Sequence, residues 1–83
     1  MNPIAFEVTL ASGEKVTAKS VAPDFVAFET KFDRSISSLS KDIRITDMLF
    51  LAWHALKRTG VTSLEFEPWT ETVENLTVAE GKA

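Results

Sequence analysis

Apolar and polar residues alternate along the first ten positions, and this alternation limits the fold more strongly than any other feature of the sequence. The apolar members are Ile4, Phe6, Val8 and Leu10. A period of two is typical of a strand that buries one face. Gly13 suits a tight turn and the alternation resumes over residues 15–19, so the sequence predicts a β-hairpin. Because a hairpin alone is marginal in water, the rest of the chain or a partner must cover its apolar face.

A first helix is predicted over residues 23–34. Phe25, Phe28 and Phe32 fall on one apolar stripe, which Ile36 continues beyond the predicted end. Pro23 and Asp24 suit the first turn, because proline is tolerated there and a carboxylate favours the N-terminal end of the helix dipole. The serine-rich stretch 35–40 that follows is predicted to be a mobile connector, since serine competes for backbone hydrogen bonds.

A second helix is predicted from Thr46 to Thr59. Thr46 is a good N-cap, and Gly60 is placed to adopt the left-handed conformation that ends many helices. Lys57 and Arg58 lie in the last turn, where positive charge complements the helix dipole. This segment therefore has residues typical of the start and of the end of a helix, separated by a length usual for one.

A third helix is predicted to begin at Pro68, after a short loop. Its apolar side consists of Trp69, Val73 and Leu76. Together these elements predict a single small α+β domain over residues 1–78, in which an N-terminal β-hairpin packs on three α-helices. A length of 83 residues allows one such domain. Residues 79–83 are predicted to form a flexible tail.

Composition argues against several classes of function. The chain has no cysteine, which excludes disulfides and thiolate metal sites, and its single histidine, His54, lies in an apolar helix where a structural role is expected. The net charge is −3 without a basic stripe, so nucleic acid is not an expected partner. The apolar runs are too short to cross a bilayer, and the N-terminus lacks the basic region of a signal peptide. We therefore expect no enzyme, no catalytic residues, no metal or other cofactor, no membrane contact, and residence in the cytoplasm.

The second helix carries more apolar surface than one covering layer requires. At about 100° per residue, Phe50 falls on its polar face and Trp53 at an edge of its apolar arc. In one interpretation the helix is central and buried between the hairpin and the first helix. In the other, Phe50 and Trp53 belong to an exposed patch that binds another chain. Phe66 and Trp69 are open to the same two interpretations, so these four side chains are the candidate partner-binding residues.

The second helix and the loop after it also carry a family resemblance. Residues 48–60 read M-L-F-L-A-W-H-A-L-K-R-T-G, and residues 61–69 read V-T-S-L-E-F-E-P-W. This part resembles the tail assembly chaperones of long-tailed, non-contractile bacteriophages, which often have an L-A-W-x-A-x-x-R-x-G run before a short loop and an aromatic-acidic-x-aromatic helix start. The hairpin with its Ala-Ser-Gly turn and the phenylalanine-rich helix also fit, so the resemblance covers about residues 5–78.

The resemblance implies a protein that binds the tape measure protein, keeps it soluble and helps recruit tail tube subunits, including the major tail protein. Such a protein acts in the host cytoplasm and is absent from the mature virion. Self-association into a homo-oligomer is a further expectation, because it would bury the wide apolar arc until the partner appears. The alternative is a small structural protein of the phage head–tail junction or tail that remains in the virion.

Overall fold

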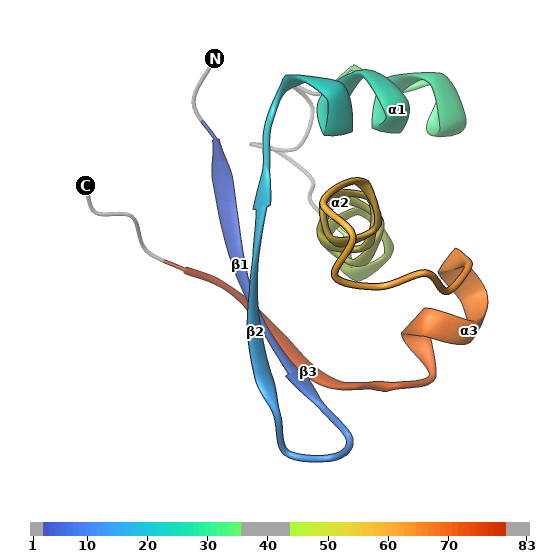
Figure 1. Cartoon of the computed structure of the whole chain (residues 1–83). Helices are drawn as coiled ribbons and strands as arrows, with labels where there is room; N and C mark the ends of the chain where they lie inside the picture. Colours follow the sequence, from blue (N-terminus) through green and yellow to red (C-terminus); the bar gives the residue numbers. More distant parts are fainter. Residues whose placement is uncertain (1–2, 36–43, 80–83) are drawn as a thin grey trace.

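The sheet and its covering helices form two layers in the computed structural model, which describes residues 3–35 and 44–79 (Figure 1). The elements in chain order are β1 (Ile4–Leu10), β2 (Lys15–Ser20), α1 (Ala22–Phe32), α2 (Ile45–Arg58), α3 (Phe66–Thr70) and β3 (Val73–Val78). The strands form an antiparallel sheet in the order β2-β1-β3, and the helices lie on one face of it. The predicted α+β class is confirmed.

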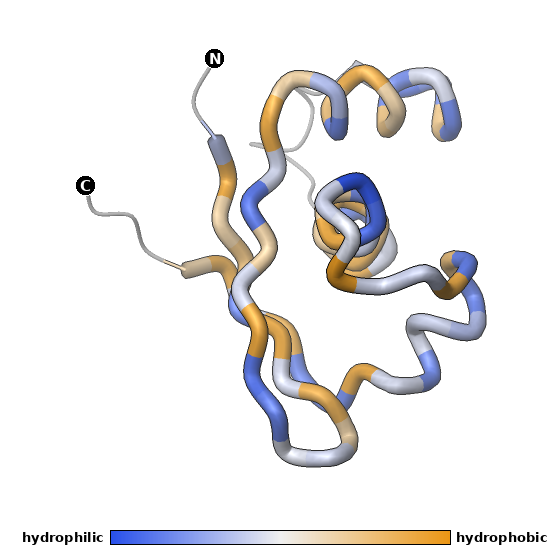
Figure 2. The backbone as a smooth tube through the Cα atoms, viewed as in Figure 1, coloured by the Kyte–Doolittle hydropathy of each residue, from blue (hydrophilic) through white to orange (hydrophobic). Residues whose placement is uncertain are grey.

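The predicted hairpin is confirmed as β1 and β2. Phe6 lies opposite Ala18 and Val8 lies opposite Val16, and Gly13 has the positive φ of 95° that its turn requires. The alternation of apolar and polar residues is visible along both strands in Figure 2. Because successive side chains point to opposite faces, Phe6 and Val8 are fully buried under the helices while Glu7 is exposed on the other face.

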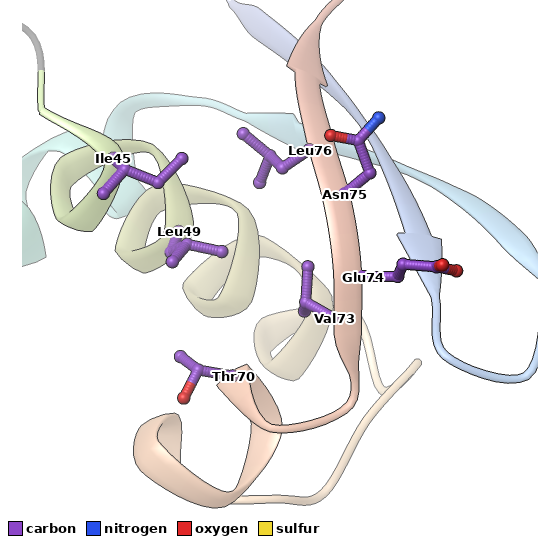
Figure 3. A pocket seen from close by; sticks show the side chains of 7 residues that line it. All are labelled: Ile45, Leu49, Thr70, Val73, Glu74, Asn75 and Leu76. Atoms are coloured by element: carbon purple, nitrogen blue, oxygen red, sulfur yellow. The ribbon is translucent and has the colours of Figure 1, made fainter.

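The third predicted helix is wrong beyond Thr70, because the chain there forms β3 instead. β3 pairs with β1, and the register skips Glu74: Thr9 lies opposite Asn75 and Leu10 opposite Val73. This bulge turns Val73 and Leu76 to the same face of the sheet, toward α2 (Figure 3). A spacing of three between inward residues is also the spacing of a helix, which explains the error. The hairpin is therefore part of a three-stranded sheet.

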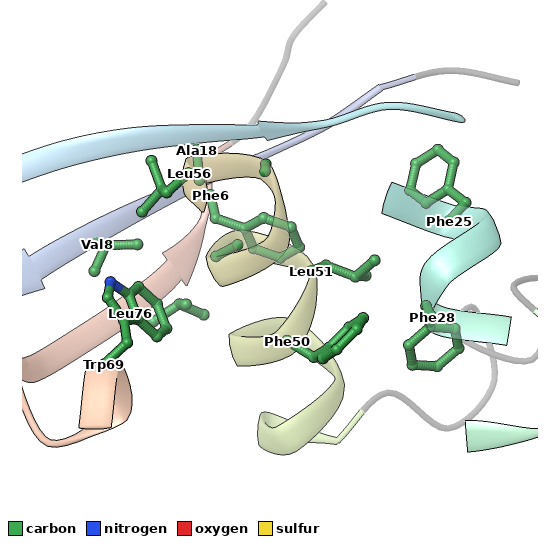
Figure 4. Packing of buried hydrophobic residues seen from close by; sticks show 12 residues of the cluster. Phe6, Val8, Ala18, Phe25, Phe28, Phe50, Leu51, Leu56, Trp69 and Leu76 are labelled. Atoms are coloured by element: carbon green, nitrogen blue, oxygen red, sulfur yellow. The ribbon is translucent and has the colours of Figure 1, made fainter. Parts of the chain in front are cut away.

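The helix α2 is the central element of the core (Figure 4). The buried apolar residues are Phe6, Val8, Ala18, Phe25, Phe28, Phe50, Leu51, Ala52, Ala55, Leu56, Trp69 and Leu76. The helical map predicted Phe50 on a polar face, yet this side chain is only 5% exposed. Its ring lies 5.2 Å from that of Phe32 in α1 and 5.8 Å from that of Phe66 in α3, centroid to centroid. Cover from both neighbouring helices is what buries it.

Buried aspartates define the starts of the two longer helices. The carboxylate of Asp24 accepts the backbone N–H of Val21 at 2.8 Å, and that of Asp47 accepts the N–H of Arg44 at 3.1 Å. The α2 N-cap is therefore Arg44 and not Thr46 as predicted. Each aspartate satisfies a backbone amide that would otherwise have no partner in its helix.

The end of α2 follows the sequence prediction. Gly60 adopts a left-handed conformation with φ of 85°. Its N–H donates to the carbonyl of Lys57, and the next N–H, of Val61, donates to the carbonyl of Leu56. These two bonds form a Schellman motif, which satisfies carbonyls of the last turn. Of the predicted connector 35–40 and tail 79–83, residues 36–40 and 80–83 lie outside the described residues.

Candidate functional site

The helix α2 does not lie over the middle of the sheet. It packs chiefly on β2 and less on β1. An α-helix with its side chains is about 10 Å wide, and strands lie about 4.8 Å apart, so one helix covers roughly two strands. The third strand, β3, therefore keeps part of its inner face open along the side of α2.

An open groove runs between α2 and β3 at this position (Figure 3). Its volume is about 230 Å³. The groove, called the α2–β3 groove below, is lined by Ile45, Leu49, Thr70, Val73, Glu74, Asn75 and Leu76. Ile45 is 56% exposed, and Leu49 and Val73 are only partly buried. Exposed apolar side chains on two facing walls are typical of a site that binds another apolar group.

The part of the chain that leads into β3 and forms it carries negative charge. Residues 59–79 contain four glutamates and no lysine or arginine. Glu65 forms an ion pair with Lys57 at 2.6 Å, whereas Glu67, Glu71 and Glu74 are exposed. The side chain of Glu74 points away from α2, so the side chains that face each other across the groove are the apolar ones of α2 and β3 (Figure 3).

The structure places three of the four candidate partner-binding residues in one aromatic cluster. The ring of Trp53 lies 5.6 Å from that of Phe50 and 5.5 Å from that of Phe66. Its indole N–H donates to the carbonyl of Leu64 at 2.9 Å, and the ammonium of Lys57 lies 5.4 Å from its ring centroid. The cluster thus packs Phe66 and the residues just before it against α2.

Trp69 lies apart from this cluster, under the sheet beside Val8 and Leu76 (Figure 4). It is 3% exposed, so both Trp69 and Phe50 are core residues of the folded chain. Trp53 and Phe66 keep part of their surface exposed, and partner binding by these two residues stays a prediction. The groove residues Ile45 and Leu49 are apolar and four positions apart, so helical spacing places them on the same side of the second helix. Val73 gave no sequence signal for the groove, because it was assigned to a helix.

A second apolar depression lies at the hairpin end of the molecule. It has a volume of about 200 Å³ and is lined by Leu10, Val16, Leu56, Val61, Thr62, Leu64, Trp69 and Thr72. Val61 and Leu64 are exposed apolar residues at this site. The chain therefore leaves apolar surface open in more than one place, as expected for a small domain with one layer of helices.

A buried ionic cluster joins α1 to α2. The carboxylate of Asp24 accepts hydrogen bonds from Arg58 at 2.9 and 3.1 Å and lies 2.6 Å from Nδ1 of His54. Burial alone would raise the pKa of Asp24, but the hydrogen bonds from Arg58, His54 and Val21 and the charge of Arg58 outweigh it and lower the pKa. The same contact raises the pKa of Arg58. The cluster therefore stabilises the charged form of a fully buried carboxylate.

The described residues include no group of three or more His, Cys, Asp or Glu side chains that could hold a metal ion. Within residues 3–35 and 44–79, none of the helices is long and apolar enough to cross a membrane. No protein family, curated protein or solved structure was found to match the chain.

Proposed function

We propose that the chain is a tail assembly chaperone of a long-tailed, non-contractile bacteriophage. It binds the tape measure protein, keeps it soluble in the host cytoplasm, and helps recruit the subunits of the tail tube. The sequence resemblance of residues 48–69 suggests this function. The observation that carries it is the α2–β3 groove, where Ile45 is exposed beside Leu49 and Val73 on a chain of only 83 residues.

The groove offers two apolar walls to the side chains of a bound helix. Ile45 and Leu49 are one helical turn apart on α2, and Val73 and Leu76 face them from β3 (Figure 3). A helix laid in this groove would pack beside α2 and cover the open part of β3, at the 8–10 Å spacing usual between packed helices. Tape measure proteins are long and helical, and an apolar stripe on such a helix would be covered by helix-in-groove recognition.

Co-expression of the chain with the tape measure protein tests the proposal. We expect the wild-type chain to raise the soluble fraction of the tape measure protein and Ile45→Asp to abolish this effect. Ile45 is the first residue of α2, where an aspartate suits the helix dipole, so the variant is expected to fold. Val26→Asp is the matched control, because Val26 is 62% exposed on α1, outside the groove.

An unchanged soluble fraction with the wild-type chain would refute the chaperone function. An equal loss of effect in Ile45→Asp and Val26→Asp would refute the groove as the binding site. Mass spectrometry of purified particles separates the alternative function, because a structural protein of the head–tail junction or tail is present in the virion and a chaperone is absent.

A further inference from the structure

We infer that the α2–β3 groove selects an amphipathic helix that carries lysine or arginine beside its apolar stripe. The inference rests on the proposed function and specifies the chemistry of the tape measure segment that the groove binds. It depends on two separate properties of the groove, its two-walled apolar interior and the sign of the charge around it.

The apolar interior determines that the occupant has an apolar stripe. The side chains of Ile45 and Leu49 come from α2 and those of Val73 and Leu76 from β3, and all four point into the space between the two elements (Figure 3). A helix in this space contacts both walls with side chains spaced three and four residues apart. A strand added at the open edge of β3 would instead bond to the backbone and leave Ile45 uncovered.

The charge around the groove determines which charged side chains the bound helix carries beside its apolar stripe. On the β3 side, Glu74 lines the groove and Glu71 follows the lining residue Thr70 in the chain. Both are exposed, and residues 59–79 contain no lysine or arginine. On the α2 side, the carboxylate of Asp47 is bound by Arg34 at 2.8 Å. Ile45 lies at the end of the groove away from Thr70 (Figure 3), and Arg44 precedes it in the chain.

The carboxylate of Glu74 does not need to point into the groove to act on a partner. Charges interact over a Debye length of about 10 Å at moderate salt, which exceeds the width of a single strand. Basic side chains on the flank of a bound helix therefore lie in a favourable potential along the β3 wall, and acidic ones are repelled. Screening by salt weakens both effects.

The test uses two synthetic amphipathic peptides with the same leucine stripe, one flanked by lysines and the other by glutamates. Fluorescence anisotropy measures their binding to the whole chain. We expect the lysine peptide to bind about fivefold or more tightly, since exposed charge pairs contribute modestly and several act together. In about 0.5 M salt, where the Debye length falls to roughly 4 Å, the difference should largely disappear.

Two double variants test whether the glutamates near the groove cause the preference for the lysine peptide. Glu71→Lys with Glu74→Lys should remove the preference for the lysine peptide. Glu7→Lys with Glu14→Lys changes the net charge by the same amount, but neither residue lines the groove: Glu7 lies in β1 opposite Thr17 of β2, and Glu14 follows the hairpin turn. This control should therefore keep the preference. All four positions are exposed, and circular dichroism checks that each variant folds.

Equal binding of the two peptides, tighter binding of the glutamate peptide, or no binding of either overturns the inference. An equal effect of the two double variants overturns it as well. If the wild-type chain solubilises the tape measure protein but the peptides bind equally, this inference fails and the proposed function stands. If the lysine preference holds but the solubility of the tape measure protein is unchanged, the proposed function fails and the chemistry of the groove stands.

Discussion

Two aspartates illustrate how much of this fold depends on single side chains. Asp24 accepts the N–H that starts α1 and binds Arg58 at the C-terminal end of α2. Asp47 accepts the N–H that starts α2 and binds Arg34. Both carboxylates are buried, and both accept hydrogen bonds from a backbone amide and from an arginine. The sequence indicated the acidic first turn at Asp24. It could not indicate the arginine partners, because Arg58 is 34 residues away from Asp24.

The lowered pKa of Asp24 predicts a loss of stability in acid. Because its pKa is lower in the folded than in the unfolded chain, Asp24 stabilises the fold above its unfolded pKa of about 3.9, and this contribution is lost as the pH falls through the folded pKa. Asp24→Asn should lower the free energy of unfolding at neutral pH by about 2 kcal/mol, the scale of hydrogen bonds to a charged group.

Urea unfolding of the wild-type chain and of Asp24→Asn across pH 3–7 measures this effect, with Glu14→Gln as an exposed control. The difference in unfolding free energy between wild type and Asp24→Asn should shrink as the pH falls below about 4. A difference that stays constant down to pH 3 would contradict the role assigned to the ionised carboxylate.

At the scale of elements, the sequence predicted those whose pattern is local. The alternation in β1 and β2 and the left-handed Gly60 after α2 are set by near neighbours, and they are confirmed. β3 was missed because its bulge places inward residues three apart, as in a helix, and because its pairing with β1 joins residues about 70 positions apart, such as Phe6 and Val78. Strand pairing at that separation leaves no local signal.

Proline substitution tests the assignment of β3. The N–H of Ala79 donates to the carbonyl of Ala5, and alternate residues of an antiparallel strand point their amides the same way. The N–H of Thr77 therefore faces β1, and that of Val78 faces the open edge. Thr77→Pro should cost about 1–3 kcal/mol of unfolding free energy in urea titration, and Val78→Pro much less. Equal costs would argue against this register.

At the scale of the whole molecule, the sequence predicted a surplus of apolar surface but not its position. The helical map assigned the surplus to Phe50 and Trp53, yet α1 and α3 cover Phe50, and Trp53 packs within the same cluster. Apolar surface is also open at Ile45, Leu49 and the β3 wall, because α2 is displaced toward β2. Which side of a central helix remains open depends on where its neighbours pack, and a periodic pattern along one helix does not contain that information.

The most direct test of the account is a chemical-shift map of the backbone amides of the chain, titrated with the lysine-flanked amphipathic peptide. We expect the largest shifts in the first turns of α2, around Ile45 and Leu49, and along β3 from Val73 to Leu76. Largest shifts around Trp53 and Phe66, or on the outer face of the sheet at Glu7 and Thr17, would contradict the assignment of the groove as the binding surface.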